Sequence, residues 1–224
     1  MRMKELRWLF LAVLAVALLL SFMAEPVTFG ISQQWTNGTY RFAGGTHPVA
    51  LAFALIIVVL YLLLMFAPPA TLGNPFPGVF RRLVAFWLDF VLAMMVVAPF
   101  MGVLPTLTEW KRTGQFEWNF ERTTHAPGDG WLTLAGLTIC FAGLVFYYAF
   151  PLTRCRPSPG ACIAGYQIVR DDGVSINART ALLRTLLGFL AACAAYLAPF
   201  VARDRKKGKF WLDMVFGTRA LTLR

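Results

Sequence analysis

The residues Leu83–Leu104 read LVAFWLDFVLAMMVVAPFMGVL and carry a single charged side chain, Asp89. A run of this length is enough to cross the hydrocarbon core of a bilayer, which takes about 20 helical residues. Because lipid offers no partner for backbone N–H and C=O groups, the run is expected to be an α-helix. This stretch therefore predicts an integral membrane protein with an ionisable group inside one of its spans.

Further apolar runs extend this prediction to the whole chain. Trp8–Ala24, Pro48–Ala67 and Trp131–Leu152 are long enough, or nearly so, to cross a bilayer, whereas Leu186–Val201 is shorter. Of the 224 residues, 58% are hydrophobic and 14% are charged, whereas a soluble domain carries about 25% charged residues. We predict an all-α polytopic membrane protein with four transmembrane helices and a fifth segment that is re-entrant or in-plane. A full crossing stays open if Ala181–Leu183 extend the fifth run.

The first apolar run has two readings. Arg2, Lys4 and Arg7 precede it, as basic residues precede the apolar region of a secretion signal. The bulky Phe22 fits the small-residue cleavage rule poorly, and the run is longer than the apolar region of most signals. We therefore expect an uncleaved first transmembrane helix.

The distribution of basic residues predicts the topology, because cytoplasmic flanks collect Lys and Arg. If the fifth run turns back, the outer loops Glu25–His47 and Pro105–Gly130 hold four basic residues and the inner segments hold sixteen, with Arg184 at the edge of the run not counted. If it crosses, eleven lie outside and nine inside. We expect a multi-pass protein of the bacterial inner membrane with both termini in the cytoplasm.

The formal net charge of +10 follows from the same distribution. A basic inner face lies beside anionic lipid headgroups, so nucleic acid binding is not needed to explain the charge. The expected partners are a bilayer with anionic headgroups and either further copies of the chain or other membrane proteins, and no nucleic acid.

The first outer loop predicts a β-hairpin. Asn37–Gly38 lies between β-forming residues, which is a strong signal for a two-residue hairpin turn. In the second outer loop, Phe116, Trp118 and Phe120 alternate with polar residues, as in a strand with one aromatic face. We expect a small antiparallel sheet that is either a platform for a partner or an aromatic belt at the membrane interface.

A second β-structure is expected on the cytoplasmic face. Tyr166–Arg170 is rich in β-forming residues and leads into the turn Asp171–Gly173. Val174–Ile176 is a candidate for the returning strand, and Arg219–Leu223 is a further strand candidate.

Four short motifs occur in a fixed order along the last two-thirds of the chain. They are RRLVAFWLD at Arg81–Asp89, SPGACIAGYQIVRDDG at Ser158–Gly173, ARTALLR at Ala178–Arg184 and GKFWLDMVFGT at Gly208–Thr218. Together they resemble the RDD family, which is named for one arginine and two aspartates, over about Phe80–Leu223. Two positions depart from the family pattern: Ala161 stands where a basic residue is usual, and Leu212 stands where a histidine commonly precedes the aspartate.

The resemblance divides the chain into two parts. Residues 1–79 are expected to form an N-terminal transmembrane hairpin with its outer loop, and residues 80–224 an RDD-like membrane domain. It also implies a membrane location, and transport is the function usually attached to the family.

The charged residues of these motifs predict a polar cluster. Arg82 and Asp89 lie on one face of the third span, because they are seven residues apart with Ala85 between them. A carboxylate inside a span is costly and needs a partner or a wet cavity. We expect Arg184 to be the partner of Asp89 and Asp213 to meet Arg82, so that all four form one functional polar cluster in the inner half of the membrane. The cluster is either a structural clasp or an ion or proton site.

No enzyme constellation is recognisable. The sequence offers no catalytic triad, no histidine cluster for a metal and no phosphate-binding glycine loop, so we expect no catalytic, metal or cofactor residues. We expect transport of ions or small solutes, for example cation/proton exchange, through the Arg/Asp cluster. The alternative is a non-catalytic membrane scaffold or assembly factor that binds protein partners or lipid.

Overall fold

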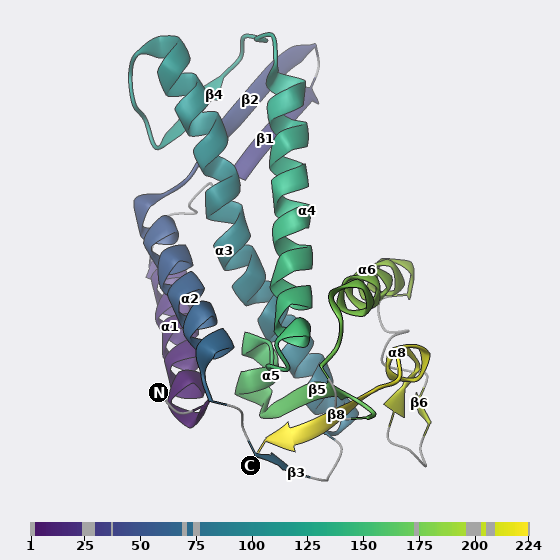
Figure 1. Cartoon of the computed structure of the whole chain (residues 1–224). Coiled ribbons are helices and arrows are strands. Elements are labelled where there is room, and N and C mark those ends of the chain that lie inside the picture. The colour runs from purple at the N-terminus through teal and green to yellow at the C-terminus, as the bar shows by residue number, and fades with distance from the viewer. Residues whose placement is uncertain are drawn as a thin grey trace. The chain divides into compact units, whose positions relative to one another are not determined.

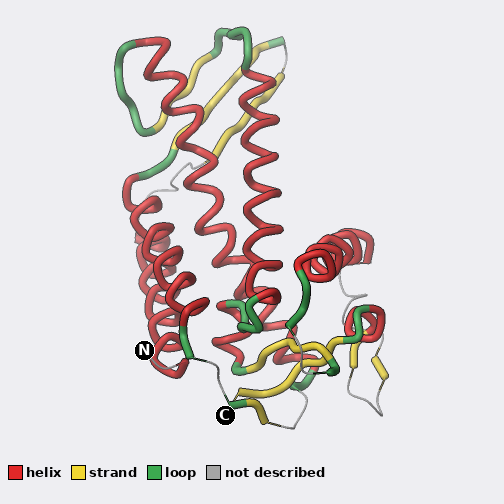
Figure 2. Tube along the Cα trace, viewed as in Figure 1, coloured by secondary structure: helices red, strands yellow, loops and turns green. Residues whose placement is uncertain are grey.

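The computed structural model describes residues 3–23, 30–36, 38–68, 71–73, 77–172, 175–195, 203–204 and 209–223, and it is mostly helical (Figures 1 and 2). The chain forms two compact units, each assembled from separate segments. Unit 1 comprises Met1–Leu11, Leu60–Leu92 and Val145–Arg224, and unit 2 comprises Ala12–Val59 and Ala93–Leu144. The candidate site described below lies within unit 1.

Four long helices cover the four predicted spans. They are α1 (Met3–Met23), α2 (Pro48–Phe66), α3 (Val79–Thr113) and α4 (Asp129–Thr153). Within the described residues, α2, α3 and α4 are long and apolar enough to cross a membrane. The chain is therefore a helical protein with three described helices that are able to span a membrane, and a fourth span at α1 remains a prediction.

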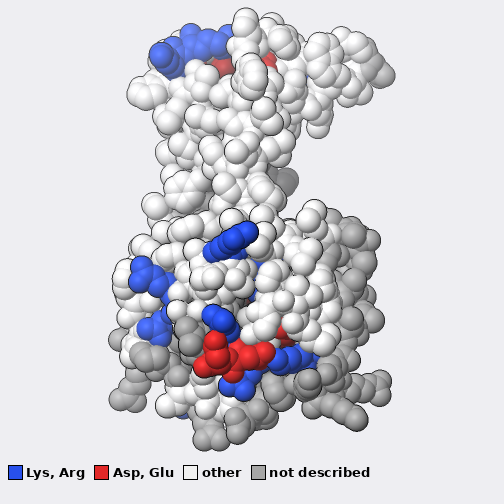
Figure 3. Space-filling model, turned by 45° about the vertical axis from the view of Figure 1, so that its right-hand side comes forward, with Lys and Arg blue, Asp and Glu red and all other residues white. Residues whose placement is uncertain are grey.

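The surface of these helices is apolar. Only 11% of the most apolar window of α4 is buried, and large side chains such as Trp131, Leu137 and Phe146 are exposed on it. Figure 3 shows few Lys, Arg, Asp or Glu residues on the described surface between the two ends of this view. An apolar surface of this extent is suited to lipid, because soluble proteins rarely expose large contiguous apolar patches.

Unit 2 contains the predicted outer-loop sheet. Strands β1 (Gly30–Thr36), β2 (Thr39–Gly45) and β4 (Asn119–Arg122) pair antiparallel in the order β1-β2-β4. Gly38 has a φ of 78°, which a two-residue hairpin turn requires and glycine adopts readily. The predicted hairpin is thus present, although Asn37 lies outside the described residues.

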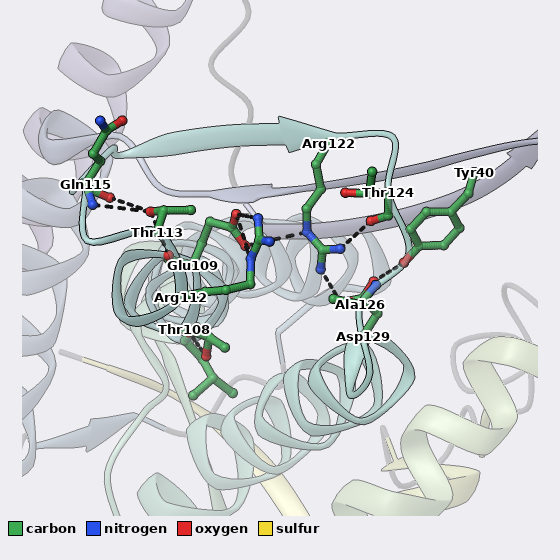
Figure 4. Close-up of polar contacts among 11 residues, drawn as sticks. Tyr40, Thr108, Glu109, Arg112, Thr113, Gln115, Arg122, Thr124, Ala126 and Asp129 are labelled. Atoms are coloured by element: carbon green, nitrogen blue, oxygen red, sulfur yellow. Dashed lines mark hydrogen bonds and ion pairs between the residues drawn. The ribbon is translucent and has the colours of Figure 1, made fainter.

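A buried polar network that the sequence analysis did not anticipate holds this sheet to the helices (Figure 4). Asp129, 1% exposed, accepts hydrogen bonds from the Tyr40 hydroxyl and the Arg122 guanidinium. Arg122 also lies 3.5 Å from the carboxylate of Glu109 on α3. Burial and the bond to Asp129 raise the pKa of Tyr40 to about 12, so its hydroxyl stays a donor.

Unit 1 contains the second predicted β-structure. Strands β3 (Leu72–Gly73), β8 (Thr218–Leu223) and β5 (Tyr166–Arg170) form an antiparallel sheet in the order β3-β8-β5, with Arg170 opposite Thr218. The two predicted strands Tyr166–Arg170 and Arg219–Leu223 are therefore paired.

The predicted returning strand is wrong over its described part. Ser175 and Ile176 form no strand. The side chain of Asn177 accepts a 2.7 Å hydrogen bond from the backbone N–H of Thr180, which caps the start of α6 (Ala178–Ala195). Ile176 is buried against Leu152 instead. The chain therefore turns into a helix at this point.

Short elements complete unit 1. They are α5 (Pro159–Ala164), β6 (Arg203–Asp204), β7 (Lys209–Phe210) and α8 (Trp211–Val215), and β6 pairs antiparallel with β7. The predicted fifth segment, Leu186–Val201, begins in the middle of α6, and residues 196–201 lie outside the described residues. The prediction that this segment is re-entrant or in-plane, and does not cross the membrane, therefore stays a prediction.

Candidate functional site

The close approach of α5 to α3 builds the first half of the site. Ser158 caps α5, with Pro159 as its first residue, and Gly165 ends it at a φ of 70°. A side chain at Gly160 would collide with the backbone carbonyl of Ala85 and would lie 2.7 Å from the Asp89 carboxyl carbon. Ala85 itself is fully buried. The small residue between Arg82 and Asp89 thus admits α5, which brings backbone N–H groups to Asp89.

The carboxylate of Asp89, 3% exposed, has neutral donors. It accepts hydrogen bonds from the Tyr147 hydroxyl (3.1 Å), the Ser158 hydroxyl (2.5 Å) and the Gly160 backbone N–H (2.7 Å). We call these four residues the Asp89 site. Among the described residues, no Lys or Arg forms an ion pair with Asp89. Within the described part of the chain, this carboxyl group therefore has hydrogen-bond donors but no ion-pair partner.

Tyr147 is itself held in place within unit 1. Its ring stacks on that of Tyr61 with the centroids 5.3 Å apart. The Tyr61 hydroxyl donates a 3.0 Å hydrogen bond to the Tyr147 backbone carbonyl. The donor that faces Asp89 from α4 is thus positioned by α2.

Asp213 on α8 forms the second half of the site, which we call the arginine–aspartate cluster (Arg82, Arg184 and Asp213). Arg82 donates to Asp213 at 2.6 Å and Arg184 at 2.7 Å. The Thr218 hydroxyl and the Phe210 backbone N–H donate at 3.2 and 3.4 Å. The Asp213 side chain is fully buried, and the Arg82 guanidinium lies 4.2 Å from the centre of the Phe210 ring. The cluster therefore ties α3, α6 and α8 together.

The electrostatics of this cluster favour an ionised aspartate. Burial by itself would raise the pKa of Asp213, but the charges and hydrogen bonds of Arg184 and Arg82 outweigh it and lower the pKa. Asp213 is consequently ionised at neutral pH, and the cluster acts as a clasp between three helices.

Both halves of the site line one cavity of about 160 Å³. Asp89 and Asp213 contribute the acidic groups, and Arg82, Arg156 and Arg184 the basic ones. The remainder of the lining is mainly apolar and aromatic: Phe86, Tyr148, Pro151, Leu152, Pro157, Ser158, Ala161, Tyr166, Ile168, Thr185, Gly188, Phe189, Phe210 and Leu212. The cavity thus combines buried charge with apolar walls.

The four predicted site residues all border this cavity, but their pairing differs from the prediction. The expected contact between Arg82 and Asp213 is present. The expected pairing of Arg184 with Asp89 is wrong, because Arg184 also bonds to Asp213, whose two carboxylate oxygens accommodate both guanidinium groups. Asp89 takes its bonds from Tyr147, Ser158 and Gly160.

Fold and site together define a class of protein: a helical membrane protein with a buried arginine–aspartate cluster beside a cavity. Comparison with protein families matches residues 76–217 to the RDD family, and the chain therefore belongs to the RDD family. The match covers more than half of the chain and includes Arg82, Asp89, Arg184 and Asp213. Comparisons with curated proteins and with solved structures gave no match.

Proposed function

We propose that this protein transports a small solute across the bacterial inner membrane, with Asp89 as the proton-carrying group. The observation that carries the proposal is the position of Asp89, which lies in a membrane-spanning helix, is buried and borders a cavity. Ionisable residues inside membrane spans are rare, and they mark substrate, ion and proton pathways.

The neutral donors around Asp89 support a proton-carrying role. The hydroxyls of Tyr147 and Ser158 are able to rotate and accept a hydrogen bond from a protonated carboxyl group. Asp89 would thus gain or lose a proton without breaking an ion pair. Asp213, by contrast, is held by two guanidinium groups and would remain charged.

The basic lining of the cavity favours the transport of a neutral or anionic solute over cation/proton exchange. Arg82, Arg156 and Arg184 border the same space as Asp89. Like charges repel strongly where little water screens them, so the cavity is unsuited to a metal cation. A neutral or anionic solute that moves together with a proton therefore fits better than cation/proton exchange.

We further propose that unit 1 faces the cytoplasm, with the N-terminus on that side. Unit 1 contains 17 of the 21 Lys and Arg residues and 6 of the 11 Asp and Glu residues, whereas unit 2 contains 4 and 5. The net charges are thus +11 and −1, and cytoplasmic segments are the ones that collect basic residues.

Because four or five helices enclose little space, we propose that copies of the chain, or other membrane proteins, complete the pathway.

The second candidate function is a membrane scaffold or assembly factor without catalytic activity. The arginine–aspartate cluster supports it, because two arginines from different helices, one buried and one partly buried, are both bonded to the buried Asp213 and form a clasp. The exposed rings of Trp110, Phe116 and Trp118 in unit 2 pack edge to face and offer a surface for a partner or for the membrane interface. A scaffold would need the bonds of Asp89 but no proton exchange.

Flux measurements distinguish these functions. Purified protein in proteoliposomes should move a small anionic or neutral solute when a pH gradient is imposed, and Asp89→Asn should abolish this flux while leaving the protein folded. The control Asp172→Asn changes an exposed carboxylate that pairs with Arg170 and should leave flux unchanged. If neither wild type nor Asp172→Asn moves any solute from a panel of small anions and neutral metabolites, the scaffold is favoured. Unchanged flux in Asp89→Asn would exclude Asp89 as the proton carrier.

A further inference from the structure

The guanidinium group of Arg82 has one hydrogen-bonded edge and one edge without a hydrogen-bond partner among the described residues, which we call the open edge. Its Nη1 donates to Asp213, whereas Nε and Nη2 are buried and have no hydrogen-bond partner among the described residues. The side chain is 8% exposed. The Nε and Nη2 groups point in one direction, and this pair is the fork that binds two oxygens of a carboxylate or phosphate. Buried donors without a partner are destabilising. A ligand that accepts hydrogen bonds from the open edge would therefore stabilise the protein.

Two further arginines that border the same cavity also have a buried donor without a partner among the described residues. The Nε atoms of Arg156 and Arg184 are also buried and lack a partner within the described part of the chain. Three guanidinium groups thus meet two carboxylates, Asp89 and Asp213, around one space. With both carboxylates ionised, one positive charge is left uncompensated, which attracts a monovalent anion.

The arrangement of the three arginines suits a phosphate group better than a carboxylate. A planar carboxylate on the open edge of Arg82 would use both of its oxygens there. A phosphate group keeps further oxygens for Arg156 and Arg184. The volume of about 160 Å³ is that of about five liquid water molecules, enough for a small head group. Apolar walls such as Phe86 and Leu212 suit the part of a molecule that carries no charge.

We propose that this cavity binds a phosphate group through the open edge of Arg82 and the Nε atoms of Arg156 and Arg184. The phosphate belongs either to the headgroup of an anionic lipid or to a free phosphate ion, since both present the same oxygens. The inference goes beyond transport, because the site would equally anchor a structural lipid in a protein that moves nothing.

Arg156 provides the cleanest test, because it forms no ion pair among the described residues and its loss leaves no carboxylate unpaired. Inorganic phosphate is titrated into purified protein in detergent, and the thermal midpoint is followed at constant ionic strength with chloride as the reference. We expect a saturable rise for wild type. Arg156→Gln should weaken phosphate binding by roughly 10- to 100-fold, the loss of one hydrogen bond from a charged donor. The matched control Arg154→Gln removes an exposed arginine that stacks on Phe150 and does not border the cavity, and it should bind as wild type does.

A second variant and a lipid arm complete the experiment. Arg82→Lys keeps a cation for Asp213 but lacks the two-pronged edge, so it should fold and bind phosphate more weakly. Phosphatidylglycerol added to the detergent micelles distinguishes the sources: a lipid headgroup site gives a rise in midpoint that inorganic phosphate competes away, whereas a site for free phosphate responds to the ion alone. No rise for wild type with either ligand would overturn the proposal, as would an Arg156→Gln response equal to that of Arg154→Gln. Phosphate binding without flux of any solute in the panel would support this site and favour the scaffold function over transport, so the two failures are distinguishable.

Discussion

Asp213 is a fully buried acidic residue whose carboxylate depends on several hydrogen-bond donors. Its carboxylate is fully buried and bonded to two guanidinium groups, one hydroxyl and one backbone N–H. Removing one member of such a group leaves the other members buried without a counter-charge. The resulting loss in the free energy of unfolding is larger than the stabilisation that the intact group provides. Asp213 is therefore the residue at which a small chemical change should have the largest structural effect.

We expect Asp213→Asn to destabilise the protein by ~3–5 kcal/mol, because Arg82 and Arg184 both lose their counter-charge. The measurement is the midpoint of thermal or denaturant unfolding in detergent. Asp171→Asn is the control, since it makes the same replacement at a partly exposed carboxylate that pairs with Lys209, and its cost should be ~0–1 kcal/mol. Equal effects at the two positions would contradict the clasp.

The lowered pKa of Asp213 predicts a dependence of stability on pH. A carboxyl group whose pKa is lower in the folded state contributes its stabilisation above the unfolded pKa of about 3.9, and loses it as the pH falls through the folded pKa. Wild type should therefore lose stability progressively below about pH 4. Unfolding midpoints measured across this range should fall more steeply for wild type than for Asp213→Asn, which lacks the titrating group. Parallel curves would show that Asp213 does not carry this dependence.

Among individual residues, the sequence predicts the contact of Arg82 with Asp213, but it wrongly pairs Arg184 with Asp89 and does not predict the neutral donors of Asp89. The contact of Arg82 with Asp213 follows from two charged groups beside apolar runs, each in need of a counter-charge. The donors of Asp89 carry no such signal, because a tyrosine, a serine and a backbone N–H are all common in membrane helices and loops. Nothing in the spacing of Tyr147 or Ser158 distinguishes them from their neighbours.

Among the elements, α5 is the one that defines the Asp89 site. It is six residues long and lies against α3 at Gly160 and Ala85. A helix this short has little stability of its own, so its position depends on the fit at that contact.

Gly160→Ala should move α5 away from α3, because the added carbon would lie 2.7 Å from the carboxyl carbon of Asp89 and closer still to the Ala85 carbonyl. We expect a loss of ~1–3 kcal/mol from overpacking, seen as a lower thermal midpoint. Gly188→Ala in α6 is the matched control, since the added carbon would meet only Leu212 Cδ1 at 3.8 Å, and it should be neutral or stabilising. A Gly160→Ala variant as stable as Gly188→Ala would show that the contact tolerates a side chain.

The elements that the sequence predicts are those with a local cause. The turn at Gly38 and the β-forming run Tyr166–Arg170 specify their strands directly. The helix α5 is too short to produce a periodic pattern, so it was not foreseen. At Ser175–Ile176 the capping side chain of Asn177 prevails over the β-forming residues before it.

For the whole molecule, the two compact units differ from the two parts, residues 1–79 and 80–224, into which the sequence is expected to divide. The family match begins at residue 76, and the division of the chain near residue 79 stays a prediction. The two compact units each combine segments from both sides of that boundary, because α2 and the N-terminal part of α1 contribute residues to unit 1. Packing between distant helices sets the units, and no local pattern in the sequence records it.

The charge difference between the units makes the topology testable. We expect a single cysteine introduced at Ser175, in unit 1, to be protected from a membrane-impermeant thiol reagent in intact cells, and one at Thr124, in unit 2, to react. The native cysteines are replaced by alanine beforehand, and permeabilised cells provide the full-labelling control. Labelling of position 175 in intact cells would place unit 1 outside and refute the orientation.

The partner of Arg82 lies 131 residues further along the chain. Strand β8, the central member of the β3-β8-β5 sheet, comes later still. The ribosome has therefore made the described helices α1 to α4 and α6 before either the clasp or the sheet is able to form. The helices must enter the bilayer with Arg82 and Arg184 still lacking the counter-charge of Asp213, so assembly of the cluster follows insertion of these helices. A premature stop codon between α6 and α8 would leave an inserted but unfinished protein, of the kind that membrane proteases remove.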